Sequence, residues 1–184
     1  KLLEPHIEKI YYLMYKPVGV ETTMVGRSGK CHHDKLQATK GNQRIPQGDT
    51  VNRLERAKTV TTLYDLLPIS LRTKLFPIGR LDKDSEGLLL FTNDGELKYR
   101  LEHPKFDHEK EYEVEVAEQI FDGALRKLEK GVMIDGAKTK KARVTRLGER
   151  NFRIALTEGR NRQIRRMCQK VGSVVVNLRR IRIM

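Results

Sequence analysis

The chain has 184 residues, of which 38% are hydrophobic, and this is enough for one domain with a single core. It has no run of ~18 apolar residues, which excludes a membrane-spanning helix, and its two cysteines lie too far apart in sequence to suggest a disulfide framework. We therefore expect a monomeric domain without a membrane partner in a reducing compartment, either the cytoplasm or an organelle matrix.

The net charge of +13 is concentrated at one end of the chain. Residues 138–184 contain 15 basic and 2 acidic residues, whereas residues 1–137 contain 22 of each. A generic solubilising surface would distribute the charge more evenly. The asymmetry therefore favours a polyanionic partner, and it is typical of nucleic-acid binding.

The first third of the chain contains a strand, a polar stretch and a short helix. Apolar residues at 10–13 predict a strand that ends in the turn Lys16–Gly19. Residues 26–56 are rich in Gly, Gln, Asn, Lys and Arg, which indicates an exposed insertion, either a simple loop or a segment that touches RNA. Thr62 and Asp65 then predict a capped helix that a proline ends.

The remainder of the chain alternates between strands and helices. Apolar residues at 87–91 predict a buried strand, and Asn93 is placed to cap a helix that ends before Pro104. The later elements are a half-buried strand at 112–116, a helix at 120–128, strands at 142–144 and 152–156, an amphipathic helix at 159–171, and a last strand within 174–183. This order predicts an α+β fold in which helices flank a large, mixed and mostly antiparallel sheet.

One group of potential metal ligands, Cys31-His32-His33-Asp34, lies in the polar stretch. Adjacent residues rarely converge on one ion, and no second pair of ligands follows in the sequence. We therefore expect no metal site and no other cofactor.

Carboxylates and basic side chains are concentrated in the segment GRLDKDSEG at 79–87. Extended backbone would direct Arg80 and Asp82 to one side and Leu81 to the other. Asp82 is then a candidate nucleophile or base beside an arginine, and the alternative is an acidic turn with surface ion pairs. Asp82 and Asp84 would also suit the acid pair of a glycosidase, although the basic surface fits a polyanion better than a neutral sugar.

Lys110 and Tyr112 share the apolar face of the strand at 112–116. Burying a lysine is costly unless its ammonium group reaches a partner or the rim of the sheet. Lys110 therefore either has a function there or extends to solvent at the strand end. Tyr112 either belongs to the core or stacks on a base.

Four arginines, Arg160, Arg162, Arg165 and Arg166, lie within seven residues near the start of the helix at 159–171. Guanidinium groups fit phosphate and carboxylate, and a helix N-terminus favours anions. Because like charges four residues apart repel, this density favours contact with phosphate or with an active-site carboxylate over ordinary solvation.

Together these segments resemble the RsuA-type pseudouridine synthases, which isomerise selected uridines in RNA. The matching pieces are YKPVG at 15–19, GRLDKDSEGLLLFTNDG at 79–95, HEKEY at 108–112 and EGRNRQIRRMC at 158–168, and they occur in family order. FPIGRLDKDSEG, DHEKEY and the final RIRIM are most similar to the RluF branch, which acts on large-subunit ribosomal RNA.

The resemblance implies a role for each matching residue. Asp82 aligns with the catalytic aspartate of the family, Arg165 with the basic residue paired with that carboxylate, and Tyr112 with the aromatic residue that packs on the target base. Arg80 aligns with the arginine that helps to hold the target nucleotide out of the helix. The remaining candidates for RNA contact are Lys16, Lys110, Arg160, Arg162 and Arg166.

The implied reaction breaks the N-glycosidic bond, turns the uracil and rejoins it through carbon 5, without a cofactor. It needs an ionised carboxylate, either as a nucleophile or in forming a glycal intermediate, and the Tyr112 hydroxyl is a candidate relay for the carbon 5 proton. The implied partner is ribosomal RNA, with transfer RNA as the alternative. The alternative function is a catalytically silent RNA-binding factor of ribosome assembly.

Residues 1–184 are then expected to form the catalytic domain of this family. Family members usually connect quickly where residues 26–56 stand, so this segment departs from the pattern. They also usually carry a small N-terminal RNA-binding domain, which we expect to be absent from this chain.

Overall fold

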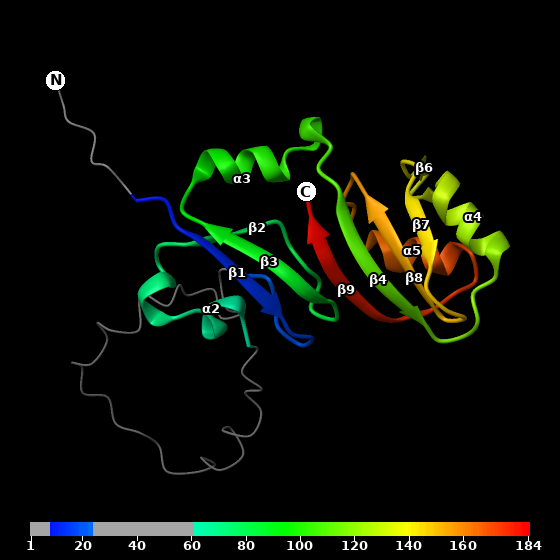
Figure 1. The fold of residues 1–184 in the computed structure, drawn as a ribbon, viewed down its shortest axis with the longest axis horizontal. Helices are drawn as coiled ribbons and strands as arrows, with labels where there is room; N and C mark the ends of the chain where they lie inside the picture. The colour runs from blue at the N-terminus through cyan, green and yellow to red at the C-terminus, as the bar shows by residue number, and fades with distance from the viewer. Residues whose placement is uncertain (1–7, 24–60) are drawn as a thin grey trace, which may run out of the picture.

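A computed structural model describes residues 8–23 and 61–184, so the expected insertion at 26–56 and the ligand group at 31–34 lie outside the described residues. A seven-stranded sheet forms the centre, in the order β1-β3-β9-β4-β8-β7, with β2 paired to β3 (Figure 1). Its strand pairs are antiparallel except for β3 and β9. The predicted α+β fold with a mixed, mostly antiparallel sheet is confirmed.

The strands are β1 (Tyr11–Lys16), β2 (Phe76–Ile78), β3 (Glu86–Thr92), β4 (Lys110–Val116), β5 (Met133–Ile134), β6 (Ala137–Lys138), β7 (Arg143–Arg146), β8 (Asn151–Leu156) and β9 (Val175–Ile183). The helices are α2 (Leu63–Leu66), α3 (Gly95–Glu102), α4 (Asp122–Lys130) and α5 (Gln163–Lys170), with short 3-10 turns at Ile69–Leu71 and Pro104–Phe106. None of the helices in the described ranges is long and apolar enough to cross a membrane.

The sheet has two parts, and each part has its own hydrophobic core. In one part, residues of β1 and β3 pack against α2, with Leu89 and Phe91 fully buried. In the other part, β4, β8 and β9 pack against α4 and α5, with Leu128 and Met167 fully buried. Strand β9 lies between β3 and β4 and so joins the two parts (Figure 1).

The junction between the two parts is short. Strand β9 pairs with β3 only at Glu86 and Gly87, which face Arg179 and Arg180, while β2 pairs with the other end of β3. A Cβ atom on Gly87 would lie 2.2 Å from the carbonyl oxygen of Arg180, and the φ angle of Gly87 is +111°. Only glycine fits both the close approach and this conformation.

Local sequence signals located most elements but missed some boundaries. The capping pair Thr62 and Asp65 is confirmed. The cap of α3 is Asp94 rather than Asn93, because the Asp94 carboxylate accepts the first backbone N–H groups, whereas Asn93 bonds the chain before β1. Helix α5 begins only at Gln163. The sequence did not predict strand β2 or the β5–β6 hairpin, whose strands are only two or three residues long.

Candidate active site

A cavity of about 740 Å³ opens where the two parts of the sheet meet. Its walls come from the loop after β2, from β4 and β9, and from residues 156–164. Six of the nine site residues predicted from the sequence line this cavity: Arg80, Asp82, Lys110, Tyr112, Arg160 and Arg162. The other three, Lys16, Arg165 and Arg166, are not in its lining.

Asp82 lies in the loop between β2 and β3, residues 79–85, called here the Asp82 loop. The side chain of Leu81 is buried while Arg80 is exposed, which agrees with the predicted alternation. The Thr22 hydroxyl donates to the Leu81 carbonyl at 2.7 Å and accepts from the Leu81 N–H at 3.2 Å. These bonds fix the backbone beside Asp82, whose side chain remains one-third exposed to the cavity.

Lys16 supports the Asp82 loop and does not face RNA, so its predicted RNA contact is wrong. Its side chain is fully buried, and its ammonium group donates to the carbonyls of Ser85 at 2.6 Å and Pro17 at 2.9 Å. Burial lowers the pKa of Lys16 to about 8, against the opposing attraction of Asp84 and Asp82. A fully buried ammonium group is not available to a phosphate.

Asp84 connects the Asp82 loop to the start of α5. Both of its carboxylate oxygens accept from Arg162, at 2.9 and 2.7 Å, in the forked geometry that suits a guanidinium group. This contact holds the pKa of the Asp84 carboxyl below its usual range. An acid that stays ionised cannot serve as the general acid of a glycosidase, so the Asp82–Asp84 acid pair is not supported.

Arg165 pairs with Asp84, not with Asp82 as the sequence suggested. Its Nη2 donates to the Asp84 carbonyl at 2.7 Å, its Nε lies 3.3 Å from the Asp84 carboxylate, and its Nη1 donates to Val175. Within the described residues, the ion pair of Asp82 is with Arg162, at 3.9 Å. Arg165 therefore acts on the Asp82 loop through the carbonyl and the carboxylate of Asp84.

Arg180 is a pocket residue that the sequence reasoning missed. It is 1% exposed, and it donates from Nε to the Leu88 carbonyl at 2.8 Å and from Nη1 to the Arg80 carbonyl at 3.3 Å. It faces Tyr112 across the β4–β9 pair and lines the same cavity. Its Nη2 is buried without an acceptor in the described structure, and such a donor is costly unless a bound group satisfies it.

Tyr112 and Lys110 form the wall that strand β4 contributes. Both side chains are partly buried, and Tyr112 packs against the larger core while reaching the cavity. Burial lowers the pKa of Lys110, and the nearby Arg180 charge adds to this effect. Tyr112 thus contacts the core and also lines the cavity, and its stacking on a base stays a prediction.

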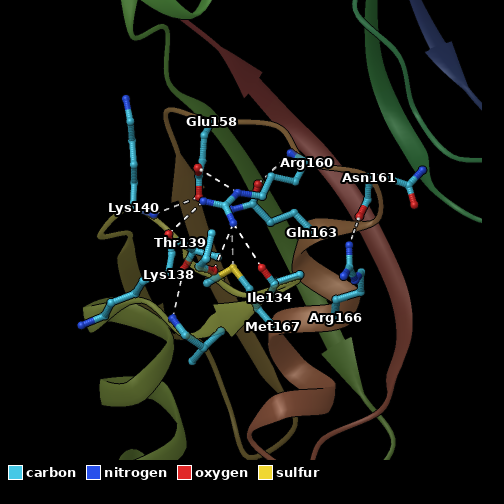
Figure 2. A network of polar contacts seen from close by, with 12 residues as sticks. Ile134, Lys138, Thr139, Lys140, Glu158, Arg160, Asn161, Gln163, Arg166 and Met167 are labelled. Carbon is cyan, nitrogen blue, oxygen red and sulfur yellow. Dashed lines mark hydrogen bonds and ion pairs between the residues drawn. The ribbon is translucent and has the colours of Figure 1, made fainter.

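Arg160 is held by internal contacts, although it was predicted to bind RNA (Figure 2). Its guanidinium group donates to the carbonyls of Ala137 at 3.2 Å and Lys138 at 2.8 Å, and it pairs with Glu158 at 3.4 Å. Gln163 donates to the same Glu158 carboxylate at 2.6 Å. Arg160 therefore connects the β5–β6 hairpin to the start of α5, and each nitrogen of its guanidinium group has a partner within the chain.

Arg166 is also engaged within the protein. It forms an ion pair with Asp135 of the β5–β6 turn. It also donates to the Asn161 carbonyl at 3.4 Å (Figure 2). The arginine cluster thus pairs with carboxylates of this chain, and only Arg162 and Arg165 reach those of the Asp82 loop; contact with phosphate stays a prediction. No group of three potential metal ligands gathers anywhere in residues 8–23 and 61–184.

The missed residues left weak signals in the sequence. Asp84 lies two positions after Asp82, and of these two the resemblance assigns a role to Asp82 alone. Arg180 lies in β9 between the exposed Arg179 and the partly buried Arg182, so its inward direction depends on which face of β9 meets the cavity. The pairing of β9 with both β3 and β4 decides this, and that pairing is a long-range feature.

Comparisons with known proteins agree with this geometry. A family model described as RNA pseudouridylate synthase matches residues 10–170. The dual-specificity RNA pseudouridine synthase RluF of Salmonella typhi is 50% identical over 111 residues, covering 60% of this chain and 38% of the relative. The ribosomal large subunit pseudouridine synthase B of Bacillus subtilis is 34% identical over 179 residues, covering 94% of this chain and 61% of the relative.

The fold also has a solved counterpart. A crystal structure of a pseudouridylate synthase superposes with a TM-score of 0.74 at 27% identity, covering 96% of this chain and 63% of that one. This chain spans between about two-fifths and three-fifths of the length of these relatives. The match over residues 10–170, which includes the Asp82 loop, Tyr112 and the arginine cluster, shows that the chain belongs to the RNA pseudouridylate synthase family.

Proposed function

We propose that this protein is an RNA pseudouridine synthase and that residues 1–184 form its catalytic domain. The observation that carries the proposal is the meeting of Asp82 and Tyr112 in one cavity, although they come from the two different parts of the sheet. The cavity volume, about 740 Å³, lies within the usual range for sites that enclose a small molecule. It can therefore receive one nucleotide taken out of its stack.

The proposed reaction starts with cleavage of the bond between uracil N1 and ribose C1′. The Asp82 carboxylate either attacks C1′ or assists glycal formation, and both routes need the ionised acid. The uracil then turns and C5 bonds to C1′. In the first route this breaks the bond between Asp82 and C1′, and in the glycal route the proton taken from C2′ is returned. N1 gains a proton and C5 loses one. Tyr112 supports the base during this turn, and its hydroxyl is the proposed relay for the C5 proton.

The proposed substrate is ribosomal RNA, and large-subunit RNA is favoured. The Bacillus subtilis relative is named for the large ribosomal subunit, and 15 of the 37 basic residues lie in the last 47 positions. A duplex substrate must release the target base at a cost of a few kcal/mol. Contacts between basic side chains and phosphates would offset that cost.

The test compares Asp82→Ala with Asp122→Asn, a matched acid that pairs with Arg146 on the surface. RNA carrying tritium at uracil C5 releases the label only when C5 loses its proton. We expect release by the wild type and by Asp122→Asn, and none by Asp82→Ala, which still binds RNA. Undiminished release by Asp82→Ala would contradict the proposal. RNA binding without release by the wild type would favour the silent assembly factor.

A further inference from the structure

A second cavity, of about 490 Å³, lies between the C-terminal ends of α4 and α5 and the β5–β6 hairpin. Four of its lining residues are lysines, and we call them the lysine ring: Lys127, Lys130, Lys138 and Lys170. The apolar residues Val132, Met133 and Val171 also line it, and Met133 is 53% exposed. The site thus combines concentrated positive charge with an open apolar surface.

The lysine ring is free of internal partners. All four side chains are exposed, and none of their ammonium groups forms an ion pair or hydrogen bond with a residue in the described ranges. The arginines of the neighbouring cluster contrast with this, because Arg160, Arg162 and Arg166 are each held by a carboxylate of the chain. Of these two groups, the one whose basic side chains lack a partner in the described ranges is therefore the lysine ring, not the neighbouring arginine cluster.

Helix stabilisation does not account for the whole ring. Lys127, Lys130 and Lys170 lie in the last turns of α4 and α5, where the helix dipole favours cations. Lys127 and Lys130 are three residues apart, however, and like charges at this spacing repel. Lys138 lies on strand β6 and gains nothing from a helix end. A bound external anion would lower the electrostatic repulsion among these four lysines.

The ring adjoins the proposed active site. Lys138 belongs to the ring, while Lys140, two residues later, lines the larger cavity; two residues of extended chain span about 7 Å. Arg160 donates to the Lys138 carbonyl and so fixes this segment between the two cavities. Figure 2 shows the side chains of Lys138 and Lys140 pointing away from the Arg160 network.

We propose that the lysine ring binds the sugar-phosphate backbone of RNA that flanks the target uridine, with Met133 and its apolar neighbours packing against a ribose or base. The occupant is RNA because the charge is positive, unpaired and next to a cavity that receives a nucleotide. This inference rests on the proposed function and deepens it. It predicts affinity without sequence preference, since contacts to phosphate carry no base information.

The test measures binding of fluorescein-labelled oligouridylates of 6 and 30 nucleotides at several salt concentrations. The pair Lys130→Gln and Lys170→Gln is compared with Arg126→Gln and Lys74→Gln, which removes equal charge from exposed positions outside both cavities. All proteins carry Asp82→Ala, so binding is measured separately from chemistry. We expect the ring variant to bind the 30-mer about tenfold more weakly, with a salt slope smaller by about 1.4 for two lost phosphate contacts. The 6-mer should lose less affinity, because it offers fewer phosphates to the ring.

Three outcomes would overturn the proposal. An equal loss in the control pair would show a general charge effect. An unchanged salt slope with a lower melting temperature would mean that the lysines only stabilise their helices. Ring-dependent binding of polyglutamate, without ring-dependent binding of the 30-mer, would identify an acidic protein partner instead. The tritium-release experiment with Asp82→Ala tests the proposed function. Its outcome does not alter these binding measurements, so failure of the proposed function and failure of this inference can be told apart.

Discussion

Arg162 and Asp84 form two parallel hydrogen bonds, 2.9 and 2.7 Å long, that tie the start of α5 to the Asp82 loop. Arg162 has a left-handed backbone conformation with φ +48°, which a non-glycine residue adopts at a cost that its surroundings must offset. The same guanidinium group lies 3.9 Å from Asp82. By binding the Asp84 carboxylate, Arg162 is therefore held next to the Asp82 carboxylate and helps to position it.

Replacing Asp84 with Asn should reduce pseudouridine formation by about tenfold to a hundredfold, the scale of a small misplacement of a reacting group. The amide offers one acceptor where the carboxylate offers two, so the fork to Arg162 is lost. The loss should fall on kcat more than on KM. Asp122→Asn is the control, and equal activity of the two variants would rule out this role.

Arg180→Lys should lower kcat by about tenfold to a hundredfold while the protein stays folded. A single ammonium group cannot reproduce the two bonds from Nε and Nη1 to the carbonyls of Leu88 and Arg80, which tie β9 to β3 and to the Asp82 loop across the junction. Arg179→Lys is the matched control, because Arg179 is exposed on the opposite face and pairs with Glu113. A loss of the same size in both variants, or one explained by melting temperature alone, would contradict the prediction.

Gly87→Ala should destabilise the protein by about 3 kcal/mol, because the new Cβ atom meets the Arg180 backbone and the φ of +111° strains any side chain. Gly123→Ala in α4 meets nothing within 4 Å and should stabilise by about 0.5 kcal/mol. Urea unfolding of both variants checks this. Tolerance of alanine at position 87 would mean that the two parts of the sheet separate more easily than the structure implies.

Lys16 should make stability rise with pH above neutrality. Its pKa is about 8 in the folded protein and 10.5 in the unfolded chain, so the unfolded chain binds more protons between these values and unfolding becomes less favourable as pH rises. The gain is on the order of 3–4 kcal/mol, at 1.36 kcal/mol for each pKa unit between these two values. Wild type and Lys16→Gln should therefore diverge between pH 8 and 10.5 in urea unfolding, and parallel curves would count against a buried, charged Lys16.

Local patterns predicted the elements well because amphipathic periodicity reports burial directly. The alternation of Tyr112, Val114 and Val116 follows β4, and the apolar stripe with Met167 marks the buried face of α5. Strands of two or three residues, such as β2 and β5, are too short to show a period. Their pairing depends on neighbours that are distant in sequence.

The sequence predicted which residues belong to the site better than it predicted their partners. Asp82 and Tyr112 belong to recognisable segments, and both line the cavity. The partner of each charged side chain depends on proximity in three dimensions. The sequence therefore predicted that Lys16 contacts RNA, although Lys16 is buried. It also predicted that Arg165 pairs with Asp82, although Arg165 pairs with Asp84. A charged residue type signals that some partner exists, and only the fold decides which one.

The short junction between β3 and β9 also bears on how the protein would lose activity under mild stress. Two cores with few shared bonds behave as separate cooperative units, and the core around Leu89 is the smaller one. Its opening would carry Asp82 away from Tyr112 while the larger core around Met167 kept its secondary structure. Inactivation on warming would then precede the main melting transition, and the first amides to exchange would be those of β1 and β2.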